Sequence, residues 1–191
     1  MGIGSSGQVL TVSGGVPAWS TPSAGGMTLI STTTLTGASV TISSIPTTYK
    51  DLVLHVRAWY TAAGTLGATF NMRQNGVTTA SSYRYVFDGS EDNVSTLKAL
   101  AGGVASAYNT QGISTTTDTQ NFSYFRFYDY ANTSHYKVVE GRIYGYRAAA
   151  SGAFYRWLGV QTTDTAAITS LDLFPASGNW GGGSALLYGV S

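Results

Sequence analysis

The chain has no cysteine among its 191 residues, and charged residues make up only 10% of it. The missing cysteine excludes disulfides, thiolate metal sites and cysteine nucleophiles. With a formal net charge of +1, the chain also lacks the excess of Lys and Arg with which nucleic-acid-binding proteins neutralise phosphates. It contains no run of about 18 apolar residues, the length that a membrane-spanning helix needs. We therefore expect neither a nucleic-acid partner nor a membrane partner.

The sequence is nevertheless typical of an ordered protein, because aromatic residues make up 13% of it. With so few charges, the surface must be covered mainly by Ser, Thr, Asn, Gly and Tyr. Such a surface has little repulsion against neighbours, which favours a protein packed against copies of itself or within a larger assembly. The N-terminus has neither the basic start nor the apolar core of a signal peptide, so we expect no cleaved leader.

The first residues differ from the rest of the chain. Gly4–Pro22 is rich in Gly and Ser, has no charged residue, and contains one apolar run at Val9–Val12 and an isolated Trp19. A segment this short cannot bury a core of its own. We predict an attachment arm and linker over residues 1–26 and a β-domain over residues 27–191. The arm side chains expected to bind outside the domain are Val9, Leu10, Val12, Pro17 and Trp19.

From residue 27 onward, apolar and polar residues alternate with period two, and Gly, Asn, Asp and Ser separate the runs. The alternation predicts strands at 28–32, 39–43, 51–60, 68–73, 82–87, 121–130, 135–146, 154–161, 167–174 and 184–190. In the strand at 51–60 it places Trp59 on the face opposite to Leu54. The sequence thus predicts an all-β fold, an antiparallel β-sandwich that is jelly-roll-like, with an extended N-terminal arm.

The connections between these strands are predicted from turn residues. Asn75-Gly76 favours a type I′ turn that joins 68–73 and 82–87 as a hairpin. Residues 90–119 contain few large apolar residues, and we expect mainly a long loop there, with at most a short helical turn at 94–100. The glycine-rich stretch 178–183 is expected to be a turn.

Few residues are available for catalysis. Nine carboxylates are present, and the pairs available to a glycosidase are Glu91 with Asp92 and Glu140 with Asp172. The segment DGSEDN offers Asp88, Glu91, Asp92 and Asn93 as oxygen ligands for Ca²⁺. His55 and His135 are too few for a three-histidine zinc site. We interpret all of these as solvated turn or strand residues, and expect no enzyme, no metal and no cofactor.

Aromatic residues are the one enriched class that could contribute to ligand binding. The larger ones that could form a stacking platform for sugars are Trp59, Tyr83, Tyr85, Tyr124, Tyr128, Tyr155, Trp157 and Trp180. Core or subunit-interface positions favour the same rings, and both interpretations stay open. The predicted surface or glycan contacts are Trp59, Tyr155, Trp157 and Trp180. Strand arginines, namely Arg57, Arg126, Arg142 and Arg156, are expected to pair with Asp129, Glu140 or Asp172, or to stack on the rings.

Two segments resemble proteins of tailed bacteriophages. The arm, GSSGQVLTVSGGVPAWSTP, resembles a segment recurrent in phage fibre and appendage proteins, through Gly7-Gln8, Leu10, Gly15, Pro17 and Trp19. The C-terminal stretch, from 169–173 through Ser177-Gly178-Asn179-Trp180 to Leu187-Tyr188-Gly189-Val190, is similar to the last strands of small phage virion domains.

The resemblance implies a virion structural protein, made in the host cytoplasm without a signal peptide and located on the virion. It implies a homotrimer that binds the major capsid protein or another virion protein through the arm. Because the chain has no repetitive shaft, a capsid decoration (cement or head-fibre) protein is the preferred interpretation. The alternative is a short tail fibre or receptor-binding tip that recognises host surface glycans.

Overall fold

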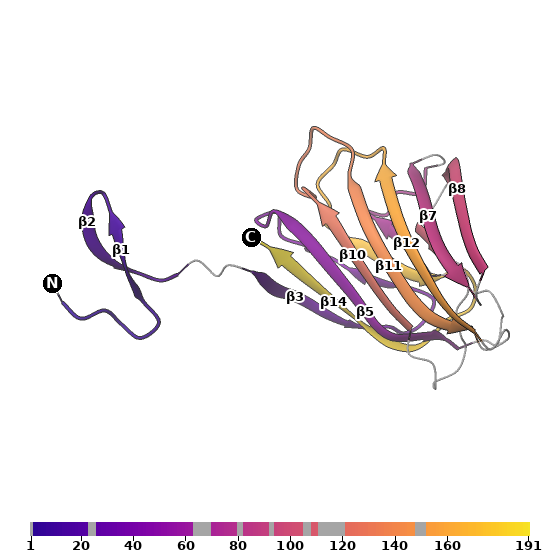
Figure 1. Cartoon of the computed structure of the whole chain (residues 1–191), viewed down its shortest axis with the longest axis horizontal. Helices are drawn as coiled ribbons and strands as arrows, with labels where there is room; N and C mark the ends of the chain where they lie inside the picture. The colour runs from indigo at the N-terminus through magenta and orange to yellow at the C-terminus, as the bar shows by residue number, and fades with distance from the viewer. Residues whose placement is uncertain are drawn as a thin grey trace.

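The computed structural model describes residues 2–22, 26–62, 70–79, 82–91, 94–104, 108–110, 121–147 and 152–191. Within these ranges the regular secondary structure is β-strand. No helix there is long and apolar enough to pass through a membrane. The predicted all-β fold, an antiparallel β-sandwich, is confirmed, and the expected N-terminal arm is a hairpin (Figure 1).

The strands form three antiparallel sheets. A hairpin pairs β1 with β2, one large sheet has the order β3-β14-β5-β10-β11-β12-β7-β8, and a small sheet has the order β4-β13-β6-β9. The small sheet lies behind the large one in Figure 1. The strands are β1 (Val9–Ser13), β2 (Val16–Ser20), β3 (Met27–Thr34), β4 (Val40–Ile42), β5 (Asp51–Thr61), β6 (Phe70–Gln74), β7 (Tyr83–Glu91), β8 (Val94–Val104), β9 (Tyr108–Thr110), β10 (Asn121–Tyr128), β11 (Val138–Arg147), β12 (Gly152–Thr162), β13 (Leu171–Pro175) and β14 (Trp180–Val190).

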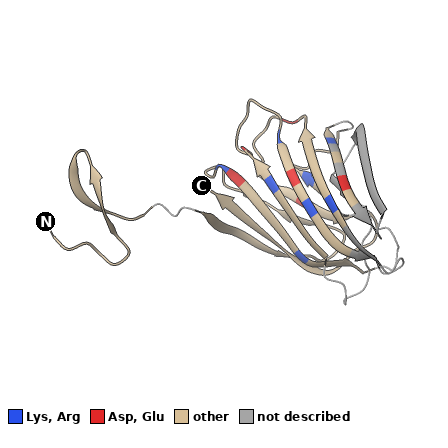
Figure 2. Cartoon of the chain, in the orientation of Figure 1, with Lys and Arg blue, Asp and Glu red and all other residues tan. Residues whose placement is uncertain are grey.

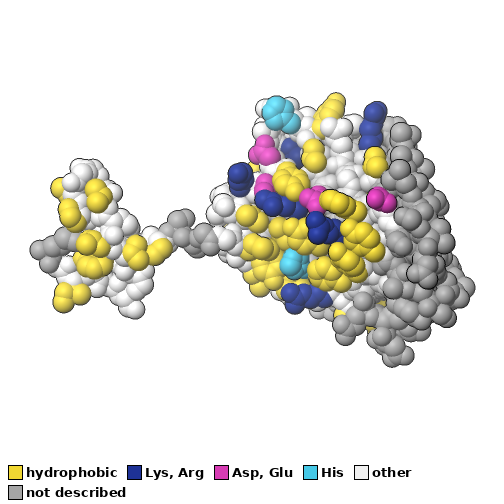
Figure 3. Space-filling view, viewed as in Figure 1, with side chains coloured by type: hydrophobic (Ala, Val, Ile, Leu, Met, Phe, Trp, Pro, Cys, Tyr) yellow, Lys and Arg dark blue, Asp and Glu magenta, His cyan; other side chains and the backbone are white. Residues whose placement is uncertain are grey.

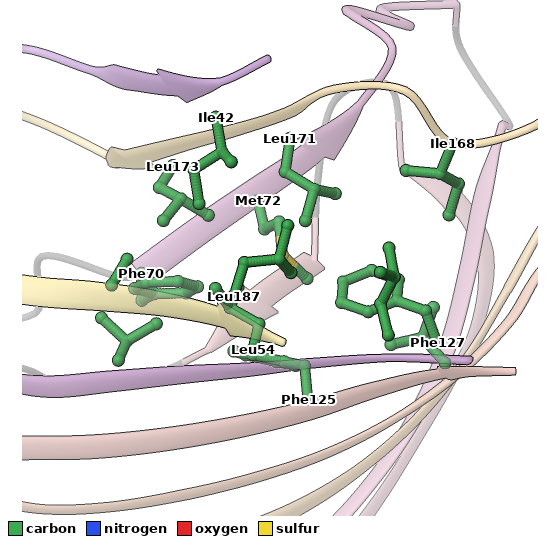
Figure 4. Close-up of a cluster of buried hydrophobic side chains, with 14 of the residues drawn as sticks. Ile42, Leu54, Phe70, Met72, Phe125, Phe127, Ile168, Leu171, Leu173 and Leu187 are labelled. Atoms are coloured by element: carbon green, nitrogen blue, oxygen red, sulfur yellow. The ribbon is translucent and has the colours of Figure 1, made fainter. Parts of the chain in front are cut away.

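The core lies between the two sheets of the sandwich. Alternate residues of each strand point inward, as the period-two pattern predicts. Figure 4 shows Met72, Leu171 and Leu173 of the small sheet facing Leu54 and Phe125 of the large sheet, and all five side chains are buried. A continuous apolar layer of this kind is the main source of stability in a chain without disulfides.

A β-bulge in β5 changes which side chains reach this core. Consecutive β10 residues lie opposite Trp59 and Arg57, so Ala58 is an extra residue, and the pairing with β14 shifts register at the same place. Ala58 also has a positive φ of 50°. One extra residue reverses the alternation beyond it. Trp59 therefore points into the core with Leu54, and the prediction that it faces the opposite side was wrong.

The predicted hairpin around Asn75-Gly76 is also corrected. The turn itself forms, with φ angles of 49° and 65° at the two residues and a hydrogen bond from the Val77 N–H to the Gln74 carbonyl. However, β6 belongs to the small sheet and β7 to the large one. The turn therefore connects the two sheets, and the strands on either side of it do not pair with each other. The Asn75 side chain binds the 167–170 segment instead, accepting from the backbone N–H of Thr169 at 2.9 Å.

Two further predictions fail near opposite ends of the large sheet. Residues 94–104 form strand β8, which pairs with β7, rather than a loop or a helical turn. The last four residues of the glycine-rich stretch belong to β14, which begins at Trp180 and pairs with β5. In both segments, pairing with a neighbouring strand decides the conformation, although the residues have little strand preference of their own.

Candidate binding surfaces

The N-terminal segment is a two-stranded hairpin. Its turn is Gly14-Gly15, with φ angles of 61° and 83°, which are the positive values that a two-residue hairpin turn requires. The register places Leu10 opposite Trp19. In Figure 1 the hairpin stands apart from the sandwich, and in Figure 2 it contains no residue coloured as charged.

One face of the hairpin is entirely apolar, whereas the other mixes hydroxyl side chains with apolar ones, including the exposed Val9 and Val16. Directly opposed residues share a face, as do residues two apart along a strand. The register therefore gathers four of the five predicted attachment residues on one face: Leu10, Val12, Pro17 and Trp19. Val9 lies on the other face, where the Thr11 hydroxyl contacts the Ser20 hydroxyl at 3.1 Å.

Only a small part of the apolar face is covered by the hairpin's own residues. The Trp19 indole donates to the Gly2 carbonyl at 2.8 Å, and its ring packs closely over Gly4. Leu10 and Val12 remain 54% and 74% exposed. The face thus offers uncharged apolar surface that has no cover from the hairpin itself.

The second surface is the outer face of the large sheet. In β10 the inward residues are buried, including Phe125 and Phe127, whereas Tyr124 and Tyr128 point outward. This strand therefore carries aromatic residues on both faces: those on the inner face belong to the core, and those on the outer face lie on the surface. Figure 3 shows hydrophobic side chains gathered in the middle of this face, with basic and acidic side chains among them.

These outward side chains line an open groove with a volume of about 510 Å³, which we call the aromatic groove. Its lining comes from β5, β10 and β11 and consists of His55, Phe122, Tyr124, Arg126, Tyr128, Glu140, Arg142 and Tyr144. Every lining residue carries a ring or a charge, and none is aliphatic.

Neighbouring rings hold one another in place across the strands. His55 lies 5.4 Å from the Tyr124 ring and 5.5 Å from the Tyr188 ring, measured between centroids. At the other side of the groove, the Tyr144 and Tyr155 centroids are 5.0 Å apart. Contacts of this length are typical of favourable aromatic pairs. The rings thus form a continuous surface from β14 to β12.

The charged groups of the groove are also held in place, by ion pairs, a hydrogen bond and a contact with a ring. Arg126 pairs with the buried Asp51 carboxylate at 2.6 Å. The Tyr128 hydroxyl donates to Glu140 at 2.8 Å, and this bond raises the pKa of Tyr128, which keeps the hydroxyl protonated. Arg142 lies 3.5 Å from Glu140 and 5.2 Å from the centroid of the Trp157 ring.

The histidine of the groove gives a pH prediction. Burial, and secondly the charge of Arg57, lower the pKa of His55 below its usual value of 6.5. Because the unfolded chain binds this proton more readily, the contribution of neutral His55 to stability is fully present above pH 6.5 and is lost as the pH falls through the folded pKa. We expect the urea midpoint to be lower at pH 5 than at pH 7.5, with a smaller decrease in His55→Gln. Equal decreases in the two proteins would contradict this.

The structure separates most of the groups considered for catalysis. Glu140 faces outward from the large sheet, whereas Asp172 faces outward from the small sheet and accepts from the Thr41 hydroxyl at 2.7 Å. This carboxylate pair therefore lies on opposite sides of the sandwich. Among the described residues there is no cluster of three or more His, Asp or Glu suited to a metal ion. Of the DGSEDN ligands, Asp92 and Asn93 lie outside the described residues.

The predicted contact residues divide between core and surface. Trp59 and Trp180 are 0% and 4% exposed, so the prediction of surface contacts was wrong for both. For Trp59 the cause is the register shift in β5, which turns it inward, where its ring centroid lies 6.2 Å from that of Trp180. Tyr155 and Trp157 lie on the outer face of the large sheet, beside the aromatic groove.

Three groove residues were missed by the sequence analysis as candidate contacts: His55, Phe122 and Tyr144. The signal was present in the alternation of the aromatic strand at 121–128, which places Phe122 on the same face as Tyr124. Their convergence depends on strand pairing, which sequence alone does not provide.

No protein-family model, no curated protein and no solved structure matches the chain.

Proposed function

We propose that the chain is a non-enzymatic structural protein of a tailed-bacteriophage virion, in which the hairpin binds the particle and the sandwich is displayed. The observation that carries the proposal is the uncharged apolar face of the hairpin, formed by Leu10, Val12, Pro17 and Trp19. An isolated two-stranded hairpin is marginally stable in water, so burial against another protein would stabilise it. The phage assignment rests on the resemblance of this segment to fibre and appendage proteins.

Within this class we propose a homotrimeric capsid decoration protein whose partner is the major capsid protein or another virion protein. The low charge of the chain supports dense packing, because little repulsion opposes contact with neighbours. The second candidate is a receptor-binding tip, and the aromatic groove on the exposed sheet face favours it. The two candidates share the hairpin as the attachment element and differ in what the sandwich does.

The attachment role predicts that two aspartates on the apolar face abolish particle binding. Leu10→Asp with Val12→Asp would bring charge into an interface that must be dry, which costs far more than the contact gains. The full-length variant should fold and fail to co-sediment with particles lacking the protein. Deletion of residues 1–22 should have the same result.

The control is Ser13→Asp, which introduces one negative charge, half that of the double variant, on the opposite face of the same strand. It should bind particles like the unaltered chain. Undiminished binding by the deletion or by the double aspartate variant would refute the attachment role. Sedimentation velocity of the unaltered chain tests the trimer separately.

A further inference from the structure

We propose that the aromatic groove is a binding site for a linear, uncharged oligosaccharide, with sugar rings lying on Tyr144 and Trp157 and sugar hydroxyls bonding to Glu140. The proposal rests on the second candidate function, the receptor-binding tip, and names its ligand; it does not depend on what the hairpin binds.

The shape fits a small ligand. Pockets that bind small molecules are concave and have volumes of roughly 300–1,000 Å³, and the groove encloses about 510 Å³. A subunit interface of ordinary size is broader, with roughly 800 Å² buried on each partner. The hollow between the outward rings therefore suits an inserted chain of sugar rings better than the surface of a second copy.

The lining fits a sugar in particular. A pyranose ring has an apolar C–H face and a rim of hydroxyls, and aromatic side chains with polar ends match both. Tyr144 in the lining and Trp157 beside it are 42% and 48% exposed, so part of each ring is accessible although Tyr155 and Arg142 pack against them. Phe122 is the one purely apolar side chain in the lining, so the groove offers little of the continuous apolar surface that a lipid chain would bury.

The polar groups are placed for hydroxyls. Glu140 receives a bond from Tyr128 through one oxygen, and its other oxygen is 3.5 Å from Arg142, a contact at the limit of a hydrogen bond. A carboxylate has about four acceptor positions and a guanidinium has five donors. Both groups therefore keep capacity for a ligand, and their fixed positions reduce the entropy lost on binding.

The charge of the groove selects an uncharged ligand. Arg126 is neutralised by Asp51 at 2.6 Å, and the remaining lining charges, Arg142 and Glu140, are of opposite sign. An acidic sugar placed beside Glu140 would bring two carboxylates together, which is unfavourable in a partly buried site. Neutral hexoses or their N-acetyl derivatives meet no such penalty.

The extent of the surface fits more than one sugar. Cross-strand pairing aligns His55, Tyr124, Arg142 and Trp157 in one row across four neighbouring strands. Strands in a sheet are about 4.8 Å apart, so three steps give a row of roughly 14 Å. This row is long enough for a short oligosaccharide lying across the strands.

The test uses the full chain and a printed array of bacterial and plant oligosaccharides, followed by titration calorimetry with the neutral hexasaccharides of glucose, mannose, xylose and N-acetylglucosamine and with oligogalacturonate. We expect saturable binding of at least one neutral oligosaccharide and weaker binding of oligogalacturonate. Trp157→Ala should weaken binding about tenfold or more, as truncation of an aromatic anchor does. Arg142→Gln should also weaken it.

The control is Tyr136→Ala, which removes an exposed aromatic ring outside the groove and should leave binding unchanged. No saturable binding to the array, a preference for oligogalacturonate, or equal binding by Trp157→Ala would overturn the proposal. The proposal would also be overturned if the unaltered chain sedimented as an oligomer and Trp157→Ala as a monomer, because the groove would then be a subunit interface. Particle co-sedimentation does not involve the groove, so failure here leaves the attachment role standing.

Discussion

Replacing Trp59 with alanine is expected to lower the free energy of unfolding by about 3–5 kcal/mol, as truncations of buried aromatic residues do. Trp59 is completely buried between the two sheets. Its ring centroid lies 5.3 Å from that of Phe70 on the small sheet and 6.2 Å from that of Trp180. Alanine would leave a cavity bounded by side chains of both sheets, and close-packed strands can fill it only in part.

The polar edge of Trp59 adds to this loss. Its indole N–H donates to the Ser123 hydroxyl at 2.9 Å. Trp59→Phe keeps most of the ring but leaves the buried Ser123 hydroxyl without this donor. We expect a smaller loss of about 1–3 kcal/mol for that variant, which separates the hydrogen bond from the packing.

Chemical denaturation of the full chain measures both losses, and Trp157→Ala is the matched control. Trp157 is 48% exposed, so the same substitution should change the free energy of unfolding by about 0.5 kcal/mol or less. For a domain of this size, the loss at Trp59 corresponds to a melting temperature lower by roughly 10 °C. Equal destabilisation at the two tryptophans would show that Trp59 is not the core residue described.

The sequence predicted the fold class and most strands because a period-two pattern survives wherever one face of a strand is buried. In β10, for example, Phe125 and Phe127 alternate with Tyr124 and Arg126, and the structure retains that alternation. The pattern failed in β5, where the single extra residue Ala58 reverses it. A bulge is created by the two neighbouring strands, so a strand considered by itself gives no sign of it.

The turn at Asn75-Gly76 illustrates a similar limit. Its backbone geometry was predicted from two residues, because few other pairs tolerate two positive φ angles. The pairing of the flanking strands depends on partners far away in the sequence, namely β13 for β6 and β12 for β7. Local preference thus described the turn and not the sheets to which its two strands belong.

The same distinction applies to the candidate surfaces. The hairpin residues were predicted together because they are close in sequence, and the Gly14-Gly15 turn brings four of them to one face. The aromatic groove combines residues of three strands between His55 and Tyr144, so its composition depended on knowing which strands are neighbours. Enrichment in aromatic residues indicated that such a surface could exist, and the topology determined which rings form it.

The second large effect is expected at Gly183, opposite the bulge in β5. Its φ of 116° is rarely adopted by residues with a side chain. A Cβ atom there would lie 2.7 Å from the Trp59 Cα and 2.9 Å from the Arg57 carbonyl oxygen. Both are backbone atoms of a central strand, so they cannot move aside as a flexible side chain would.

We therefore expect Gly183→Ala to lower the free energy of unfolding by about 2–5 kcal/mol, the sum of backbone strain and overpacking. Gly159→Ala is the control, because a Cβ at that strand glycine meets nothing within 4 Å. It should be neutral or slightly stabilising, since alanine restricts the unfolded chain more than glycine does. If Gly183→Ala were as stable as Gly159→Ala, β14 could not lie as close to the bulge in β5 as described. The explanation for the inward orientation of Trp59 would then fail as well.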